Sequence, residues 1–267
     1  MKKLENPFLF AAKFLVLFFS VLILASCGGG SSAPVVITGP GLVGIDDVSP
    51  NEPFLIVTYT LSGVSNTVDI PSDLASDGDI EFDPVTGAYF FDQNPSKDLF
   101  GEDDSQADQP EFRAFQTFSL STIPYSAQIV SATLDVVIDR VDFASTVPTF
   151  IDLVQYTTGP GGLVSGDFSA APVTPQIQGG VNSIAFTFLS SDQTGPPVDI
   201  DVTPLMQEAQ VQAFPDFQVR YVVQSLASGL RTSVKAKRAT SPSPRSKIQI
   251  KRGTSSSNTG FSRPRTR

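Results

Sequence analysis

The stretch Gln128–Val141 reads QIVSATLDVVIDRV, and it decides the fold class of this chain. Apolar and polar residues alternate along it, and this two-residue period is typical of a strand with one buried face and one exposed face. A helix would repeat its apolar residues every three or four positions. The stretch therefore predicts one half-buried antiparallel strand, whose apolar face is formed by Val130, Ala132, Leu134, Val136 and Ile138.

Short runs rich in Phe, Val, Ile, Thr and Tyr continue in both directions, separated by Gly, Pro, Asp and Ser. The same alternation recurs in 183–189, 198–202 and 217–224, whereas a helix signal is found only at 203–214, where Thr203 and Pro204 suit a helix start. Many short strands with turns between them predict an all-β fold, an antiparallel β-sandwich of jelly-roll type with one short helix. Further strands are expected at 53–61, 87–91, 112–120 and 149–156.

Residues 112–134 (FRAFQTFSLSTIPYSAQIVSATL) resemble the opening block of DNRLRE-type β-sandwich domains. The resemblance covers residues 75–225 and implies a sandwich without catalytic residues of its own. Members of that family occur on secreted or surface bacterial proteins, and some are carbohydrate-binding modules attached to polysaccharide lyases. The naming motif of the family is matched only loosely, by PEFRAF, so no ligand follows from it. Later matching blocks are 152–173, 199–208 and 216–221.

The N-terminus reads as an export signal. Lys2, Lys3 and Lys13 precede 13 uncharged, largely apolar residues at 14–26. As a helix these would span about 20 Å, less than the roughly 30 Å hydrocarbon core of a bilayer. Their length and flanks are those of a secretory signal peptide.

The lone cysteine defines the type of signal. Leu24-Ala25-Ser26-Cys27 resembles the bacterial lipobox, which implies that Cys27 is lipidated and becomes the mature N-terminus. The alternative is a chance cysteine in a simple signal anchor. A flexible Gly/Ser tether follows, and Gly28 in place of an acidic residue favours the outer membrane. We therefore expect a bacterial envelope protein held on the outer membrane by its N-terminal lipid.

Composition removes several enzyme classes. The 267 residues include one Cys, no His and no Trp, which excludes Ser-His-Asp and Cys-His nucleophile systems, His-ligated zinc or haem, and an internal disulfide. The length suits one domain of about 150–250 residues with appendages. The predicted organisation is a signal peptide at 1–26, a tether at 27–45, an acidic β-sandwich at 46–225 and a basic disordered tail at 226–267.

The charge of the chain changes sign near residue 225. Residues 27–225 hold 26 acids and four bases, whereas 226–267 hold 11 bases and no acid, with many Ser, Thr and Pro and no periodicity. Three interpretations of this tail stay open. It is a solvated segment without a specific role, an electrostatic binder of anionic lipid or nucleic acid, or a translation of the wrong frame that replaces a closing strand.

The acidic stretch 69–111 is the best chemical candidate, because Ca²⁺ takes six to eight oxygen ligands. One window starting at Asp77 and another starting at Asp92 resemble calcium loops. Both fail as EF-hands, since Phe82 and Lys97 stand where Gly is required. The alternative is a strand with Asp79, Glu81 and Asp83 outward, followed by a soluble loop. The candidate Ca²⁺ ligands in a loop of another kind are Asp92, Asn94, Asp98, Asp103 and Asp104.

The scarce bases of the acidic domain, Arg113, Arg140 and Arg220, are expected to pair with acids. Glycan binding would use aromatic rings, but in strand contexts the tyrosines are more typical of a core or a sheet face. The tyrosines in question are Tyr59, Tyr89, Tyr125, Tyr156 and Tyr221.

These features together predict a lipoprotein whose sandwich is a non-catalytic surface binding or structural module, with glycans as the candidate ligand and Ca²⁺ as the candidate cofactor. We expect a monomer, no enzymatic activity and no nucleic-acid partner. Two alternatives stay open. One is a carboxylate-dependent enzyme acting on polysaccharide, which two suitably spaced acids would allow. The other is an adhesion or scaffold protein that binds other proteins.

Overall fold

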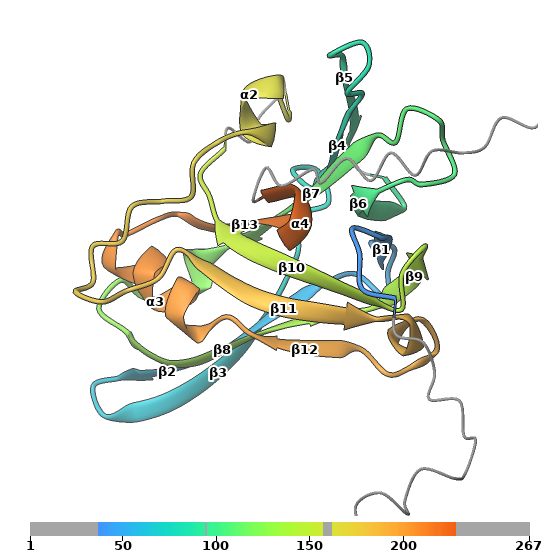
Figure 1. Cartoon of the computed structure of the whole chain (residues 1–267). Coiled ribbons are helices and arrows are strands. Elements are labelled where there is room, and N and C mark those ends of the chain that lie inside the picture. The colour runs from blue at the N-terminus through green and yellow to red at the C-terminus, as the bar shows by residue number, and fades with distance from the viewer. Residues whose placement is uncertain (1–36, 94, 157–161, 228–267) are drawn as a thin grey trace, which may run out of the picture. The chain divides into compact units, whose positions relative to one another are not determined.

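The computed structural model describes residues 37–93, 95–156 and 162–227. Within these ranges the chain forms two antiparallel β-sheets and a few short helices, so the predicted all-β sandwich with a short helix is confirmed. Figure 1 shows the smaller sheet along the lower side of the view and strands of the larger sheet above it. The predictions for the signal peptide at 1–26 and for residues 228–267 of the tail lie outside the described residues.

The smaller sheet has four strands, and a tight hairpin of its last two strands forms one edge. The two central residues of the turn, Ser62 and Gly63, both have positive φ, which is the backbone of a two-residue turn that matches the twist of antiparallel strands. The strands, in their order across the sheet, are β12 (Val198–Asp201), β8 (Gln128–Val136), β2 (Phe54–Leu61) and β3 (Val64–Pro71).

The larger sheet has nine strands, and β13 lies near its middle, between β10 and β7. Its hydrogen-bonded order is β11 (Ser183–Leu189), β10 (Thr146–Leu153), β13 (Asp216–Val223), β7 (Glu111–Ser119), β6 (Lys97–Glu102), β1 (Leu42–Asp46) and β9 (Ile138–Asp142). A hairpin of β4 (Gly78–Phe82) and β5 (Tyr89–Gln93) joins this sheet where β4 pairs with β7. β1 begins at Leu42, within the segment 27–45 in which the sequence predicted a tether.

The stretch 128–141 differs from its prediction in two ways. It is not one strand, because β8 ends at Val136 in the smaller sheet and β9 begins at Ile138 in the larger one. Val130 is 52% exposed and Ile129 is buried instead. The cause is a bulge, since the pairing with β2 passes from Ser131 directly to Ile129 and leaves Val130 unpaired. Ala132, Leu134 and Val136 face the core as predicted.

The alternation predicted at 217–224 is wrong for β13, whose residues from Phe217 to Val223 are all buried. Both faces of this central strand are covered. One face packs in the main core between the sheets, and the other lies under the short helix α2 (Ser165–Phe168), to whose backbone Arg220 donates hydrogen bonds. A smaller apolar cluster occupies this outer side: Ile80, Phe115, Val154, Tyr156, Leu163 and Phe168.

The other helical segments are short. The predicted helix at 203–214 is observed as α3 (Thr203–Val211), with Pro204 in its first turn. The remaining ones are η1 (Leu120–Thr122), η2 (Ser190–Thr194) and α4 (Gln224–Ala227). None of the helices in the described part of the chain has the length and apolar character needed to cross a bilayer.

Candidate metal centre

The structure describes four of the five predicted Ca²⁺ ligands and places them in different environments. Asp92 is exposed on β5, and Asn94 lies outside the described residues, as does the lipidation candidate Cys27. Asp103 and Asp104 lie in the loop after β6, where their carboxylates accept hydrogen bonds from loop residues. Asp92, Asp103 and Asp104 thus differ from Asp98, which lies within β6 and is fully buried.

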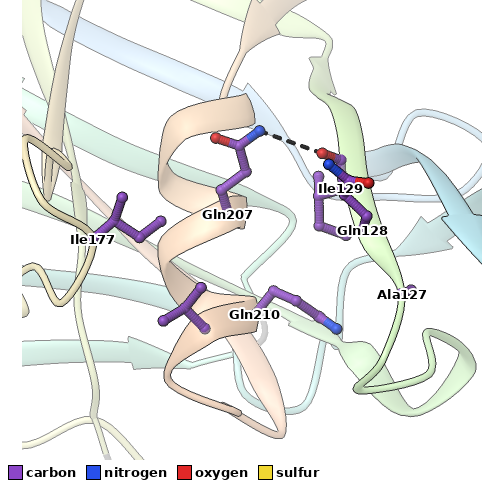
Figure 2. Close-up of a pocket in the computed structure, with 7 residues that line it drawn as sticks. Ala127, Gln128, Ile129, Ile177, Gln207 and Gln210 are labelled. Carbon is purple, nitrogen blue, oxygen red and sulfur yellow. Dashed lines mark hydrogen bonds between the residues drawn. The ribbon is translucent and has the colours of Figure 1, made fainter.

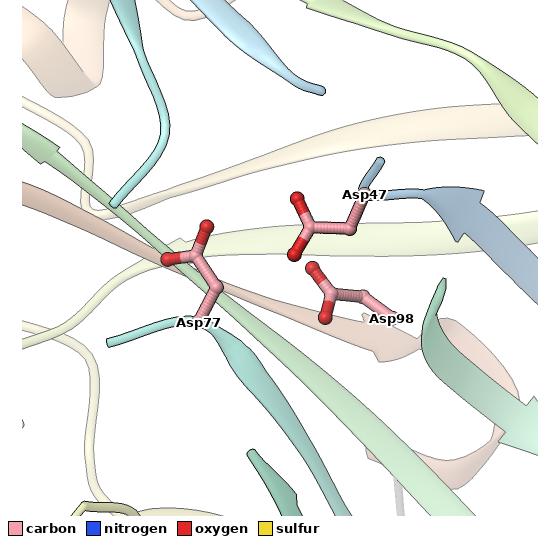
Figure 3. A group of neighbouring side chains, drawn as sticks. All are labelled: Asp47, Asp77 and Asp98. Atoms are coloured by element: carbon pink, nitrogen blue, oxygen red, sulfur yellow. The ribbon is translucent and has the colours of Figure 1, made fainter. Parts of the chain in front are cut away.

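Asp98 is instead brought together with Asp47 and Asp77. In the part of the chain that the structure describes, these three form the one group of three metal-ligating side chains, and one carboxylate oxygen of each lies within 4.8 Å of the others. Figure 3 shows the three carboxylates gathered at one place, each carried by a different segment of the chain. Sequence spacing around Asp98 therefore identified one member of the cluster, but not its companions.

Strand pairing explains why these residues meet. Asp47 directly follows β1, and β1 pairs with β6 so that Ile45 lies opposite Asp98. Asp77 directly precedes β4, which pairs with β7. The cluster thus lies where the end of β1, the start of β4 and the interior of β6 come together.

Each carboxylate has one oxygen held by a donor from the protein. Ser72 Oγ donates to Asp47 Oδ1 at 3.4 Å, and the backbone N–H of Thr117 donates to Asp77 Oδ1 at 2.7 Å. Gln116 Nε2 donates to Asp98 Oδ2 at 3.2 Å. The oxygens that remain are buried without a hydrogen-bond partner: Asp47 Oδ2, Asp77 Oδ2 and Asp98 Oδ1.

A second layer of hydrogen bonds supports these donors. The Tyr221 hydroxyl donates to Gln116 Oε1 at 2.7 Å, so the Gln116 amide is oriented with its Nε2 toward Asp98. The hydroxyls of Tyr156 and Thr117 are 2.6 Å apart. Burial, followed by the negative charge of the nearby aspartates, raises the pKa of both tyrosines well above 10.0, so both retain their protons.

The electrostatics of the cluster are unusual. Asp47, Asp77 and Asp98 are 2%, 1% and 0% exposed. Burial, together with the charge of neighbouring acids, raises the pKa of Asp47 from 3.8 to about 7 and that of Asp77 to about 9. The same causes raise the pKa of Asp98 well above 3.8. Ionisation of all three carboxyl groups would bury three negative charges close together. This is costly unless protons or a cation neutralise them.

The predicted pairing of Arg113, Arg140 and Arg220 with acids is confirmed, but those pairs lie elsewhere. The acids are Glu111, Asp142 and Asp152, and Lys97 pairs with Asp139. None of these four ion pairs of the described residues includes a member of the aspartate cluster. The charge of the cluster is therefore not balanced by these side chains.

Sequence reasoning missed Asp47 and Asp77 as partners of Asp98. Asp47 is 51 positions before Asp98, and only the pairing of β1 with β6 makes them neighbours. The available signal was weak, namely an aspartate at the end of the short strand-like sequence LVGIDD and another near the start of SDGDIEF. The interpretation of 79–83 as a strand with outward acids also needs correction, because Asp79 is buried and its Oδ2 accepts the backbone N–H of Leu99.

A separate surface groove lies between α3 and the start of β8 (Figure 2). It has a volume of about 320 Å³ and shares no residue with the aspartate cluster. Gln207 Nε2 donates across it to the carbonyl of Ile129, and Gln210 Nε2 donates to the carbonyls of Pro124 and Tyr125. The lining contains only amide and aliphatic side chains: Ala127, Gln128, Ile129, Ile177, Gln207, Gln210 and Val211.

No family model, no curated protein and no solved structure matches this chain. The resemblance to DNRLRE-type domains therefore stays a prediction from the sequence blocks quoted above.

Proposed function

We propose that this chain is an envelope-anchored lipoprotein whose β-sandwich is a non-catalytic surface binding module, and that the groove between α3 and β8 binds a glycan. The groove carries this proposal. Its lining offers amides, which form neutral hydrogen bonds with hydroxyl groups, beside the apolar surface of Ile177 and Val211. It holds no titratable side chain that could act as a nucleophile or as a general acid.

The carboxylate-dependent enzyme is less well supported. Such a mechanism needs two acids within reach of a bound substrate. The most strongly raised pKa values belong to aspartates that are at most 4% exposed, so a polysaccharide has no access to them in this fold. The cluster is better suited to a structural role than to turnover.

Lipid anchoring is tested with Cys27→Ser in the full-length precursor, expressed in a bacterium with an outer membrane. The wild type is expected in the membrane fraction and in the detergent phase, labelled by a fatty-acid analogue. The variant is expected to lose the label. A variant that keeps both its label and its membrane fractionation would contradict lipidation at Cys27, and Ser26→Ala provides a control that keeps the cysteine.

Ligand binding is tested by presenting the chain without its first 27 residues to an array of neutral and acidic polysaccharides. Val211→Arg places a long charged side chain in the groove, so we expect at least a tenfold loss of binding. Val85→Arg, on the exposed turn between β4 and β5, is the matched control and is expected to bind as the wild type does. Equal binding by both variants would remove the groove from the proposal, and release of sugar products would favour the enzyme instead.

One observation favours the protein-binding alternative. On β5, Phe90 and Phe91 are exposed, and among the described strands β5 pairs only with β4. An exposed aromatic edge strand is a common site for pairing with another chain. Phe90→Ser combined with Phe91→Ser would abolish binding to a protein partner and leave glycan binding unchanged, which separates the two candidates.

A further inference from the structure

The aspartate cluster has the arrangement of ligands around a cation. Each of its three carboxylates uses one oxygen to accept a protein hydrogen bond and leaves the other oxygen buried without a partner. Buried polar atoms in folded proteins nearly always have a partner, so three partnerless oxygens at one place call for a common explanation. The three side chains also come from separate segments, and an accidental acidic patch on one loop would not produce this convergence.

The donor set identifies the class of ion. All three side chains offer hard oxygen ligands, and the chain contains no His, whereas zinc and related metals favour nitrogen or sulfur ligands. Ca²⁺ binds oxygens at about 2.3–2.6 Å, so two oxygens on one ion are at most about 5 Å apart. One oxygen of each of the three carboxylates lies within 4.8 Å of an oxygen of each of the other two, which is the spacing that a shared ion requires. Mg²⁺ requires shorter bonds and retains several waters, which suits a buried site less well.

We propose that Asp47 Oδ2, Asp77 Oδ2 and Asp98 Oδ1 bind a single Ca²⁺ ion. Ser72, Thr117 and Gln116 orient these ligands through their hydrogen bonds to the other carboxylate oxygens, in the way that outer residues orient metal ligands elsewhere. The ion would connect the end of β1, the start of β4 and the interior of β6. Its role is structural, and it is independent of what the groove binds.

The experiment measures Ca²⁺ binding by calorimetry and thermal unfolding of the full mature chain after EDTA treatment and removal of the chelator. One ion per chain is expected, with a rise in Tm of about 5–10 °C when Ca²⁺ is a hundredfold above its Kd. The same titration with Mg²⁺ and Mn²⁺ checks the choice of ion. A Tm unchanged by both EDTA and Ca²⁺, or a rise with Mn²⁺ and none with Ca²⁺, would overturn the proposal.

Asp98→Asn gives a sharper test, because it keeps the shape of the side chain and removes one of three buried carboxyl groups that cannot all ionise without a cation. In EDTA its Tm is expected to equal or exceed that of the wild type, whereas the Ca²⁺-dependent rise is expected to disappear. Asp104→Asn is the matched control, since Asp104 is exposed in the loop after β6 and should leave Ca²⁺ binding unchanged. The opposite pattern, with binding lost in the Asp104 variant and kept in the Asp98 variant, would assign the ion to that loop instead.

If Asp98→Asn does not fold, Asp47→Asn provides a second removal of charge at the end of β1. Terbium luminescence excited through tyrosine adds a local readout, since the chain has no Trp and Tyr221 is linked to Asp98 through Gln116. Sensitised emission that Ca²⁺ displaces is expected from the wild type. Emission that persists unchanged in Asp47→Asn would place the ion elsewhere and contradict the proposal.

Discussion

Gly101 shows how a single residue without a side chain permits the strand arrangement around the cluster. It lies in β6 opposite Leu42 of β1, with φ near +120°. A Cβ atom at this position would lie 1.9 Å from the carbonyl oxygen of Gly41, closer than any real contact allows. Both the backbone angle and the contact therefore require glycine. The close approach of β6 to β1 is what brings Asp98 near Asp47.

Gly101→Ala is expected to lower the stability by at least about 2 kcal/mol, since it adds a left-handed backbone penalty to a collision with neighbouring backbone. Thermal unfolding should show this as a Tm lower by about 5 °C or more. Gly166→Ala is the control, because a Cβ there meets nothing within 4 Å. Equal Tm values for the two variants would contradict this account of β6.

The aspartate cluster also predicts how the metal-free chain responds to pH. The pKa of Asp47 is about 7 and that of Asp77 about 9 in the folded chain, against 3.8 when unfolded. Between these values the folded state holds protons that the unfolded state has released, so stability falls as pH rises from about 4 through 7 and on toward 9. Urea unfolding in EDTA is expected to give a lower free energy of unfolding at pH 8.5 than at pH 5.5.

Asp77→Asn checks the origin of this slope. The variant should show a shallower decline than the wild type, because one of the groups responsible no longer titrates. Added Ca²⁺ should flatten the wild-type curve, because the cation replaces the protons as the source of positive charge. A wild-type stability that rises with pH in EDTA would show that the buried carboxylates are paired in some other way.

At the scale of elements, two arginines of the larger sheet hold α2 in position. Arg220 Nη1 donates to the carbonyls of Phe168 and Ala170 at 3.0 and 2.8 Å, while its Nη2 donates to Asp152 at 2.7 Å. Arg113 donates to the same Phe168 carbonyl and lies 4.0 Å from the centre of the Phe168 ring. Four residues are too short to be stable as an isolated helix, so these contacts hold α2 on the outer face of the larger sheet.

Arg220→Lys should therefore loosen α2 specifically. A lysine ammonium lacks the planar fork that reaches both the helix carbonyls and Asp152, so we expect a loss of about 2–4 kcal/mol and faster hydrogen exchange at 165–170. Arg140→Lys is the control. Its partner Asp142 is about 40% exposed, and the change should cost no more than about 0.5 kcal/mol. Unchanged exchange at 165–170 in the Arg220 variant would mean that other contacts hold the helix.

Element prediction from the sequence succeeded where one face of a strand is buried and failed where tertiary structure adds a second constraint. β11 follows its alternation, with Ile184, Phe186 and Phe188 turned inward. β13 does not, because α2 covers the face that carries its polar residues. Polar residues in a strand pattern predict an exposed face, so the burial of this face could not be predicted from them. The bulge at Val130 shifts the buried face by one residue, and period-two patterns cannot show where a partner strand skips a position.

The candidate site was less predictable than the fold for the same reason. Asp98 was identified through local spacing, but its observed companions depend on which strands pair, and a single sequence does not encode that pairing in its local pattern. Asp92, Asp103 and Asp104 have the ligand chemistry of Ca²⁺ sites, yet β5 and the loop after β6 place them outside the group that converges.

At the scale of the whole molecule, all strands of both described sheets lie between Leu42 and Val223. One of the three interpretations of the tail, translation of the wrong frame, implies that a closing strand is lost where the composition changes near residue 225. β13 is the last described strand before that point, and it lies between β10 and β7 with both of its edges paired. The sandwich therefore does not leave β13 as an open edge.

A chain that ends at Ala227 is accordingly expected to fold and to melt within about 2 °C of the full mature chain. Differential scanning calorimetry of the two forms provides the measurement. A drop of 10 °C or more in the shortened form would show that residues 228–267 contribute to the stability of the sandwich, and it would argue against both the solvated tail and the frameshift.

The position of β1 has a mechanical consequence. It is the first strand of the sandwich in chain order, and it pairs along its length with β6 on one side and β9 on the other. A force applied at the N-terminal side of the chain and directed along β1 shears two ladders at once, and their hydrogen bonds must break together rather than one after another. An ion bound at Asp47 would add a further attachment at the C-terminal end of the same strand. A protein tethered at its N-terminus while its ligand is dragged by flow would then resist extraction of its first strand, and Ca²⁺ would set how much load it withstands.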